Sequence, residues 1–252
     1  MKTLTGKSRK SKILKLTVII TLIGIMAVFI ASCKWTVGVV RGSGDLVTEE
    51  RDVSGFDELH FSGMGSLIIE QGDEESLIIE ADDNIIDLIE TEVNGRDLDI
   101  KFRRGFNVVP TAKMKFYLTV IDLDRIDLSG VGDIDCESFQ TDDLEFRISG
   151  SGNVDFVIEA DTLETRISGL GDINLEGIVD SHMVKISGSG KYDARELESS
   201  ECEVDVSGLG SATVNVSEEL DISISGAGNV YYLGEPSISQ SISGLGRIKS
   251  ID

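Results

Sequence analysis

The sequence predicts an all-β fold: a single-stranded β-helix, or solenoid, with coils of about 18–20 residues, preceded by a less regular β region. Three observations predict it. The four-residue signature Ser-Gly-x-Gly recurs along the second half of the 252-residue chain. Apolar and polar residues alternate before each signature, with the period of a strand. Helical periodicity is confined to residues 84–92, which predict one short helix.

The signature predicts where each coil turns. Successive copies are 20, 19, 19, 20, 18 and 18 residues apart, and a further copy stands alone at Ser62. Glycine reaches positive φ without strain and lets two backbones approach closely, so the signature glycines are expected to be structural corners. These glycines are Gly63, Gly65, Gly130, Gly132, Gly150, Gly152, Gly169, Gly171, Gly188, Gly190, Gly208, Gly210, Gly226, Gly228, Gly244 and Gly246.

Each coil is expected to hold two or three strands of four to six residues around a narrow apolar core. Before one signature, Leu144, Phe146 and Ile148 alternate with charged residues. His182 and Cys202 occupy inward positions of the same pattern, which predicts a structural histidine and a small buried hydrophobe. The residues that directly precede the signatures are expected to form an inward column: Ile148, Ile167, Ile186, Val206, Ile224 and Ile242.

The region before the regular repeats is also predicted to be β. Residues 67–69, 77–79 and 114–121 are apolar runs typical of strands. Asn94-Gly95 between two such runs predicts a hairpin. Residues 103–110 are expected to form a loop. Because no linker of Pro or Ser divides the remainder, residues 42–252 are predicted to be one β-helical domain.

The N-terminal residues resemble the signal peptide of a bacterial lipoprotein. A basic head precedes the uncharged run 16–31, which is short for a membrane span of about 20 residues. The run ends in Ala31-Ser32-Cys33, similar to a lipobox, although Ile30 stands where leucine is common. This pattern predicts a signal peptide over residues 1–32, lipid on Cys33 and a tether over residues 33–41. An uncleaved anchor helix is the alternative, and both place the domain in the cell envelope, outside the cytoplasmic membrane.

The charge excludes one class of partner. The net charge is −22, and loss of residues 1–32 removes six basic residues and no acidic ones, which gives −28. Nucleic-acid binding needs clustered Lys and Arg, so no nucleic acid is expected to bind. Such acidity keeps a repetitive β-surface soluble, and this explanation is preferred to cation binding.

Two cysteines remain besides Cys33. An exported protein favours a disulfide between Cys136 and Cys202. Sixty-six residues, however, span more than three coils, and coils stack about 4.8 Å apart. The two cysteines are therefore expected about 15 Å apart, beyond the roughly 7 Å limit for a disulfide. Both are predicted to be buried free thiols.

The order of several motifs resembles one family. Residues 51–57 (Arg-Asp-Val-Ser-Gly-Phe-Asp), then Val93-Asn94-Gly95 and the serial signatures, are similar to the bacterial "putative auto-transporter adhesin, head GIN domain" family, a domain of unknown function. The resemblance covers residues 42–250. It implies a β-helical, exported protein. The family has no established catalytic residues that could be assigned to positions of this sequence.

The residues predict neither a metal site nor a catalytic site. The position after each signature holds Asp133, Asn153, Asp172, Lys191, Ser211, Asn229 and Arg247. This mixed row fits corner residues that bond to the backbone better than a calcium ladder, so no metal and no cofactor are expected. His60 and His182 offer no catalytic constellation, and no carboxylate pair stands out. Phe156, Tyr231 and Tyr232 form no predicted sugar-stacking face.

The sequence therefore predicts a non-catalytic envelope lipoprotein that acts as an adhesion or surface-scaffold module. Its expected partners are a membrane, through the lipid, and a protein or polysaccharide at the cell surface. A carbohydrate-binding or carbohydrate-cleaving β-helix remains one alternative. An envelope regulatory protein that binds another membrane protein is the other.

Overall fold

The computed structural model describes residues 38–251, so Cys33 and the predicted signal peptide lie outside the described residues. The described chain is nearly all-β, with 70% strand and 2% helix, which confirms the predicted fold class. Its single helix is α2 (Asp83–Ile86). Its strands are β1 (Gly38–Arg41), β2 (Leu46–Arg51), β3 (Glu58–Phe61), β4 (Met64–Gln71), β5 (Ser76–Asp82), β6 (Ile89–Asn94), β7 (Asp97–Phe102), β8 (Phe106–Val109), β9 (Lys115–Val120), β10 (Arg125–Leu128), β11 (Val131–Ile148), β12 (Asn153–Ile167), β13 (Asp172–Ile186), β14 (Lys191–Val206), β15 (Ser211–Ile224), β16 (Asn229–Leu233), β17 (Ser237–Ile242) and β18 (Arg247–Ser250).

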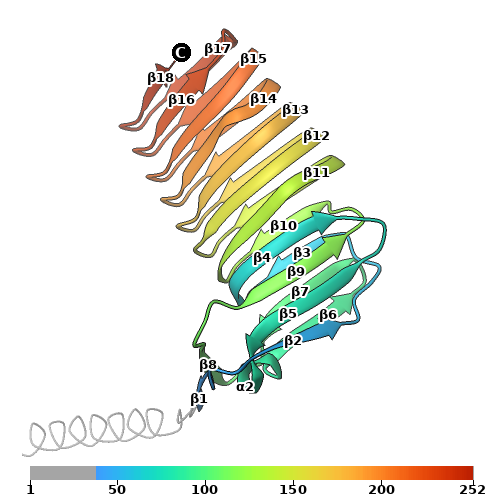
Figure 1. The fold of residues 1–252 in the computed structure, drawn as a ribbon. Helices are drawn as coiled ribbons and strands as arrows, with labels where there is room; N and C mark the ends of the chain where they lie inside the picture. Colours follow the sequence, from blue (N-terminus) through green and yellow to red (C-terminus); the bar gives the residue numbers. More distant parts are fainter. Residues whose placement is uncertain (1–37, 252) are drawn as a thin grey trace, which may run out of the picture. The chain divides into compact units, whose positions relative to one another are not determined.

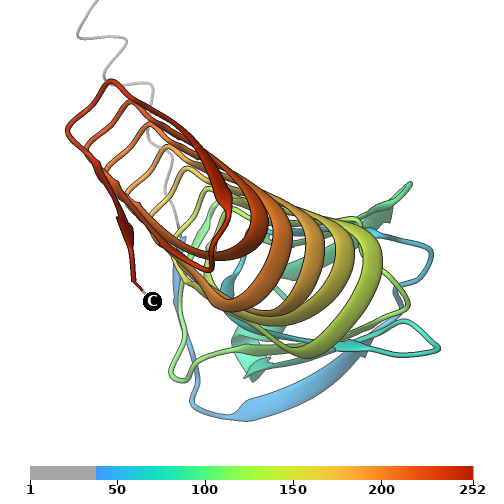
Figure 2. The same ribbon diagram turned by 90° about the horizontal axis from the view of Figure 1, so that it is seen from above.

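Strands β10 to β18 wind into a solenoid of about 7 turns (Figure 1). Each long strand pairs in parallel with the next, in the order β11, β12, β13, β14 and β15. The register places Ile148 beside Ile167 and Ile167 beside Ile186, so the predicted inward column is confirmed. Figure 2 shows the coils stacked around one narrow interior.

The strands within a coil are longer than predicted. One continuous strand of 14 to 18 residues runs from each signature to the next between β11 and β15, in place of two or three short strands. In β12, Val154, Phe156 and Ile158 point inward, and Leu163, Thr165 and Ile167 do so again after a bend. The bend at 159–162 keeps its ladder hydrogen bonds to the next coil, so the strand is not interrupted.

The isolated signature at Ser62 belongs to the same stack. Strand β3 pairs in parallel with β10, which places Phe61 beside Leu128 although 67 residues separate them. The chain then follows the same coil along β4, which pairs in register with β11 from Met64 to Ile69. Residues 72–124 are therefore an insertion between β4 and β10. Gly42-Ser43-Gly44, which resembles a degenerate copy of the signature, is not a coil corner, because it leads into β2, which pairs antiparallel with β5.

The insertion builds the less regular β region. Strand β4 pairs with β9 in parallel, and β5 pairs antiparallel with β9 and β2. The β6–β7 hairpin is confirmed, with Gly95 at φ +69°. Three expectations were partly wrong. The loop at 103–110 contains β8, the tether at 33–41 ends in β1, which pairs with β8, and the helix covers only Asp83–Ile86 because β6 begins at Ile89.

The core is continuous from the insertion through the coils. Phe156 packs edge-to-face against Phe139 and Phe146, with ring centroids 5.6 and 5.1 Å away. The column ends at Ile242, which is 46% exposed because no described strand pairs with the outer edge of β17.

The signature glycines are corners, but the reason differs from the one expected. Among them only Gly65 has a positive φ, at +141°. The others, except Gly63, are required by crowding against the backbone of the adjacent coil: a Cβ on Gly169 would lie 2.0 Å from the carbonyl oxygen of Gly150. Any side chain at this position would push adjacent coils apart.

A polar cluster lies inside the solenoid. His182 is 2% exposed, beside Cys202 in the next coil, and its Nε2 contacts the Tyr192 hydroxyl. Cys202 Sγ lies 3.8 Å from His182 Nδ1. Cys136 and Cys202 are both free and buried, as predicted. Burial raises the pKa of both thiols, to about 11 for Cys136, so neither is a reactive thiolate.

We expect His182 to make the fold sensitive to acid. Burial lowers the pKa of His182 to about 3, against 6.5 for a solvated histidine. Between these values the unfolded chain binds a proton that the folded chain does not, so stability is complete above pH 6.5 and falls as the pH drops towards 3. The slope is about 1.4 kcal/mol per pH unit. Urea unfolding of wild type and His182→Leu at several pH values measures it. A slope that is equal in the two proteins would contradict the assignment, whereas Tyr192→Phe should keep the wild-type slope.

Candidate functional site

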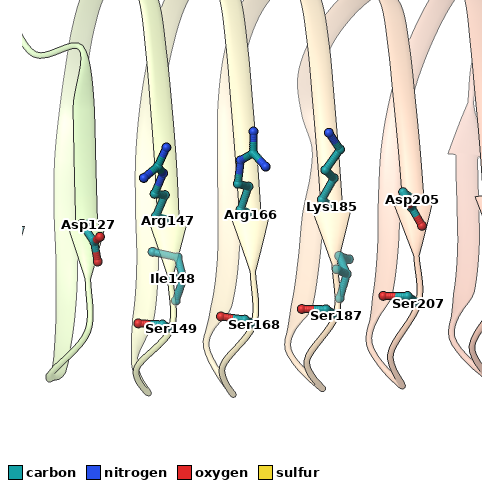
Figure 3. A pocket seen from close by; sticks show the side chains of 11 residues that line it. Asp127, Arg147, Ile148, Ser149, Arg166, Ser168, Lys185, Ser187, Asp205 and Ser207 are labelled. Carbon is teal, nitrogen blue, oxygen red and sulfur yellow. The ribbon is translucent and has the colours of Figure 1, made fainter.

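A groove of about 680 Å³ runs along the outer face of the coils from β10 to β14. Two parallel rows of side chains line it, one charged and one of serines (Figure 3). The charged row holds three cations between two aspartates. The lining residues are Asp127, Arg147, Arg166, Lys185 and Asp205, then Ser149, Ser168, Ser187 and Ser207, with Ile148 and Ile186 beneath.

The repeat explains both rows. The residue two positions before each signature points outward because the residue directly before it points inward. Parallel pairing then places Arg147 beside Arg166, and Arg166 beside Lys185. The signature serine supplies one hydroxyl per coil at the neighbouring outward position. Coils about 4.8 Å apart thus give two ladders of polar groups with the same spacing.

Glu145, which points outward two positions before Arg147, holds the two arginines of the groove in place. Glu145 Oε1 accepts from Arg147 Nε at 2.7 Å and from Arg166 Nε at 3.0 Å. Burial alone would raise the pKa of Glu145, but hydrogen bonds from Arg147 and Arg125 outweigh it, and the pKa lies below its usual range. The two guanidinium groups are therefore oriented before any ligand arrives, and 45% and 46% of their side chains stay exposed.

The groove offers hydrogen-bond donors rather than acid–base chemistry. Its two carboxylates, Asp127 and Asp205, lie at opposite ends of a row in which four coil steps separate them. At about 4.8 Å per step they are roughly 19 Å apart, whereas paired glycosidase carboxylates lie within about 9.5 Å. The lining residues include neither histidine nor cysteine. The arrangement suits binding of an extended polar chain.

The row of residues that follows each signature, considered above as a calcium site, contains side chains that hydrogen-bond to the backbone at the corners. Asp133 Oδ1 accepts from the backbone N–H of Asn153, and Asp172 Oδ1 accepts from that of Lys191, both at 2.9 Å. Burial would raise the pKa of Asp133, but its bonds to Lys113 and Asn153 lower it overall. These carboxylates satisfy the first N–H of the following coil, as the corner explanation requires.

The structure brings together a group that the sequence did not predict. Glu58, His60 and Asp97 each offer one ligand atom, and these atoms lie within 4.8 Å of one another. His60 Nε2 is 2.8 Å from Asp97 Oδ1, and Arg125 forms an ion pair with Glu58. The Arg125 guanidinium already pairs with Glu58, and His60 pairs with Asp97. These ion pairs between neighbouring strands explain why the three side chains lie together without a metal ion.

The aromatic candidates provide no sugar-stacking face. Phe156 is 2% exposed in the core, and Tyr231 and Tyr232 are half-buried on β16.

The row of cations in the groove was not predicted from the sequence. Its signal was the cation two residues before three successive signatures, at Arg147, Arg166 and Lys185.

Residues 38–251 include no helix with the length and hydrophobicity needed to cross a membrane. Together the fold and groove define a β-solenoid with a polar groove on its outer face. The chain matches the model of the family described as "putative auto-transporter adhesin, head GIN domain" over residues 55–236. The protein belongs to this family, as the motif order predicted.

Solved structures of similar proteins share the fold. A putative adhesin from Bacteroides fragilis is 30% identical, with a TM-score of 0.81 over 84% of this chain and 100% of that one. Two proteins from Parabacteroides distasonis are 25% identical with TM-scores of 0.70. One, described as a putative adhesin, covers 84% of this chain; the other, described as a putative lipid binding protein, covers 85%, and both match over 100% of their own length. A search of curated proteins returned no match.

Proposed function

We propose that this protein is a non-catalytic adhesion module of the cell envelope, and that the groove of Arg147, Arg166 and Lys185 makes the contact. The observation that carries the proposal is the cation ladder beside the serine ladder. Its donors repeat once per coil along the solenoid. An extended polysaccharide strand with carboxylate and hydroxyl groups matches such a row better than a compact ligand does.

Preorganisation supports this proposal. Glu145 holds two guanidinium groups in fixed orientations, so binding need not order them. Bidentate hydrogen bonding to carboxylates is the interaction for which arginine is best suited. The family and its solved members described as adhesins are consistent with this role. The wide separation of Asp127 and Asp205 favours binding over cleavage.

Polygalacturonate serves as a probe of the groove. We expect the triple variant Arg147→Gln/Arg166→Gln/Lys185→Gln to bind immobilised polygalacturonate at least tenfold more weakly than wild type, because each lost contact is worth about 1.5–3 kcal/mol before compensation. Affinity electrophoresis measures retention. The matched control is Arg195→Gln, whose guanidinium is 51% exposed and also paired with an aspartate, but outside the groove.

Two outcomes would contradict this proposal. Equal weakening by Arg195→Gln would mean that the probe senses charge in general. Shortening of the probe after incubation with wild type, measured by size-exclusion chromatography, would favour the carbohydrate-cleaving alternative.

The lipid on Cys33 belongs to the same proposal. The uncharged run 16–31 followed by Ala31-Ser32-Cys33 supports it. Cells expressing the full chain should incorporate a clickable fatty acid into wild type and not into Cys33→Ala. The lipid would be refuted by an unlabelled wild type or by a labelled variant.

A further inference from the structure

A row of apolar side chains projects from the corners of the coils. The third residue of the signature stands between two glycines, and Leu170, Leu209 and Leu245 there are 69%, 70% and 87% exposed. Small residues alternate with these leucines. We call this row the corner ridge: Met64, Val131, Ser151, Leu170, Ser189, Leu209, Ala227 and Leu245.

From Leu170 to Leu245 the ridge is a straight edge, whereas Met64, Val131 and Ser151 at its other end line a hollow with residues 110–114. The signatures stack directly, since the Leu170 N–H donates to Gly150 O and the Leu209 N–H to Gly188 O, at 3.1 and 3.0 Å. At about 4.8 Å per coil, the leucines repeat roughly every 10 Å. Exposed apolar side chains in a contiguous row mark an interaction surface.

Charge restricts how two such acidic chains can approach. The other bend of each coil is strongly acidic, with residues such as Asp142, Asp143, Glu159, Asp161, Glu218 and Glu219. The row beside the ridge, in contrast, mixes Asp172 with Lys191 and Arg247. The ridge is therefore the edge at which a second copy meets least repulsion.

We propose that the corner ridge pairs with the same ridge of a second copy, antiparallel, about a twofold axis perpendicular to the solenoid. In one register every leucine meets a small residue: Leu170 faces Ala227 of the second copy, Leu209 faces Ser189, and Leu245 faces Ser151. The alternation of large and small residues makes the ridge complementary to itself under this symmetry. The grooves of both copies then open on the same side.

The residues that follow each signature lie beside the ridge, and their charges agree with the same register. It places Lys191 opposite Ser211, Asp172 opposite Asn229, and Asn153 opposite Arg247, so no like charges meet. Shifting the register by one coil would oppose Leu170 to Leu209 and Lys191 to its own copy. A shift of two coils keeps most large residues opposite small ones, but it opposes Lys191 to Arg247 in one direction and Leu245 to Met64 in the other. The first register alone keeps every leucine opposite a small residue and like charges apart.

Cysteine cross-linking tests the register. The variant Leu170→Cys/Ala227→Cys should give at least tenfold more covalent dimer on mild oxidation than Val131→Cys/Ala227→Cys, which is two coils out of register. Three coils, about 14 Å, separate positions 170 and 227 within one copy, beyond the roughly 7 Å limit for a disulfide. Native Cys136 and Cys202 are buried and should not contribute, and Cys33 is replaced by serine in both variants.

Sedimentation equilibrium of the full chain in a nonionic detergent tests the association itself. Wild type should have twice the mass of one chain, and Leu170→Glu/Leu209→Glu should have the mass of one chain. The melting temperature of the variant should equal that of wild type diluted until it is monomeric, which shows that the variant is folded. The control Ile178→Glu changes a residue of 58% exposure away from the ridge and should remain dimeric. A monomeric wild type, or equal cross-linking of both cysteine pairs, would overturn the proposal. Binding of the monomer to phosphatidylcholine vesicles through the ridge would also overturn it and identify a lipid surface as the occupant.

Discussion

Replacing Gly169 with valine is expected to destabilise the solenoid by about 3 kcal/mol, the upper end of the range for overpacking. The added Cβ would lie 2.0 Å from the carbonyl oxygen of Gly150, which is backbone and cannot rotate away. Adjacent coils would have to separate, and the hydrogen bond from the Gly169 N–H to Ile148 O would lengthen from 3.2 Å. Urea unfolding followed by circular dichroism measures the loss.

The neighbouring position provides the control for Gly169. Ser168 is exposed at the same corner, and its side chain points outward. Ser168→Val should therefore change stability by no more than about 0.5 kcal/mol, as is usual for surface positions. Equal effects at residues 168 and 169 would show that crowding between coils does not explain the signature.

Replacing Phe156 with alanine is expected to cost about 3–5 kcal/mol, as is usual when a buried aromatic side chain is removed. Phe156 fills the interior between Phe139 and Phe146, and both edge-to-face contacts would be lost. The melting temperature should fall by roughly 6–20 °C, at about 2–4 °C per kcal/mol for a domain of this size. Thermal unfolding by circular dichroism measures it.

A graded substitution separates packing from other causes at Phe156. Phe156→Leu keeps most of the apolar volume and should cost clearly less than Phe156→Ala. If both variants lost the same stability, the aromatic contacts and not the cavity would dominate. A loss below about 1 kcal/mol for alanine would contradict the burial of this residue.

The period of the signature was sufficient to predict the solenoid. Coils repeat because parallel strands stack residue on residue, so one aligned column, such as Ile148, Ile167 and Ile186, sets the register of the segments just before each signature. Elsewhere in the coil the register shifts, for example between Ala194 and Glu198. The insertion was harder to recognise. Ser62 and Ser129 are 67 residues apart, and only the pairing of β3 with β10 shows that they stand in adjacent coils.

The conformation of the glycines could not be derived from the sequence. A glycine is compatible with both positive φ and close backbone approach, and only coordinates separate the two. The groove, likewise, could be predicted only in part from the sequence. The outward position of Arg147 follows from alternation, but its orientation by Glu145 depends on side-chain packing across the coils.

The most direct test of the binding face is a nuclear magnetic resonance titration of the arginine side chains with polygalacturonate. If the groove binds the probe, the Nε–Hε resonances of Arg147 and Arg166 shift together with increasing polygalacturonate, while that of Arg195 stays in place. Shifts of Arg195 equal to those of Arg147 and Arg166, or unchanged resonances for all three, would contradict the assignment of the groove as the contact surface.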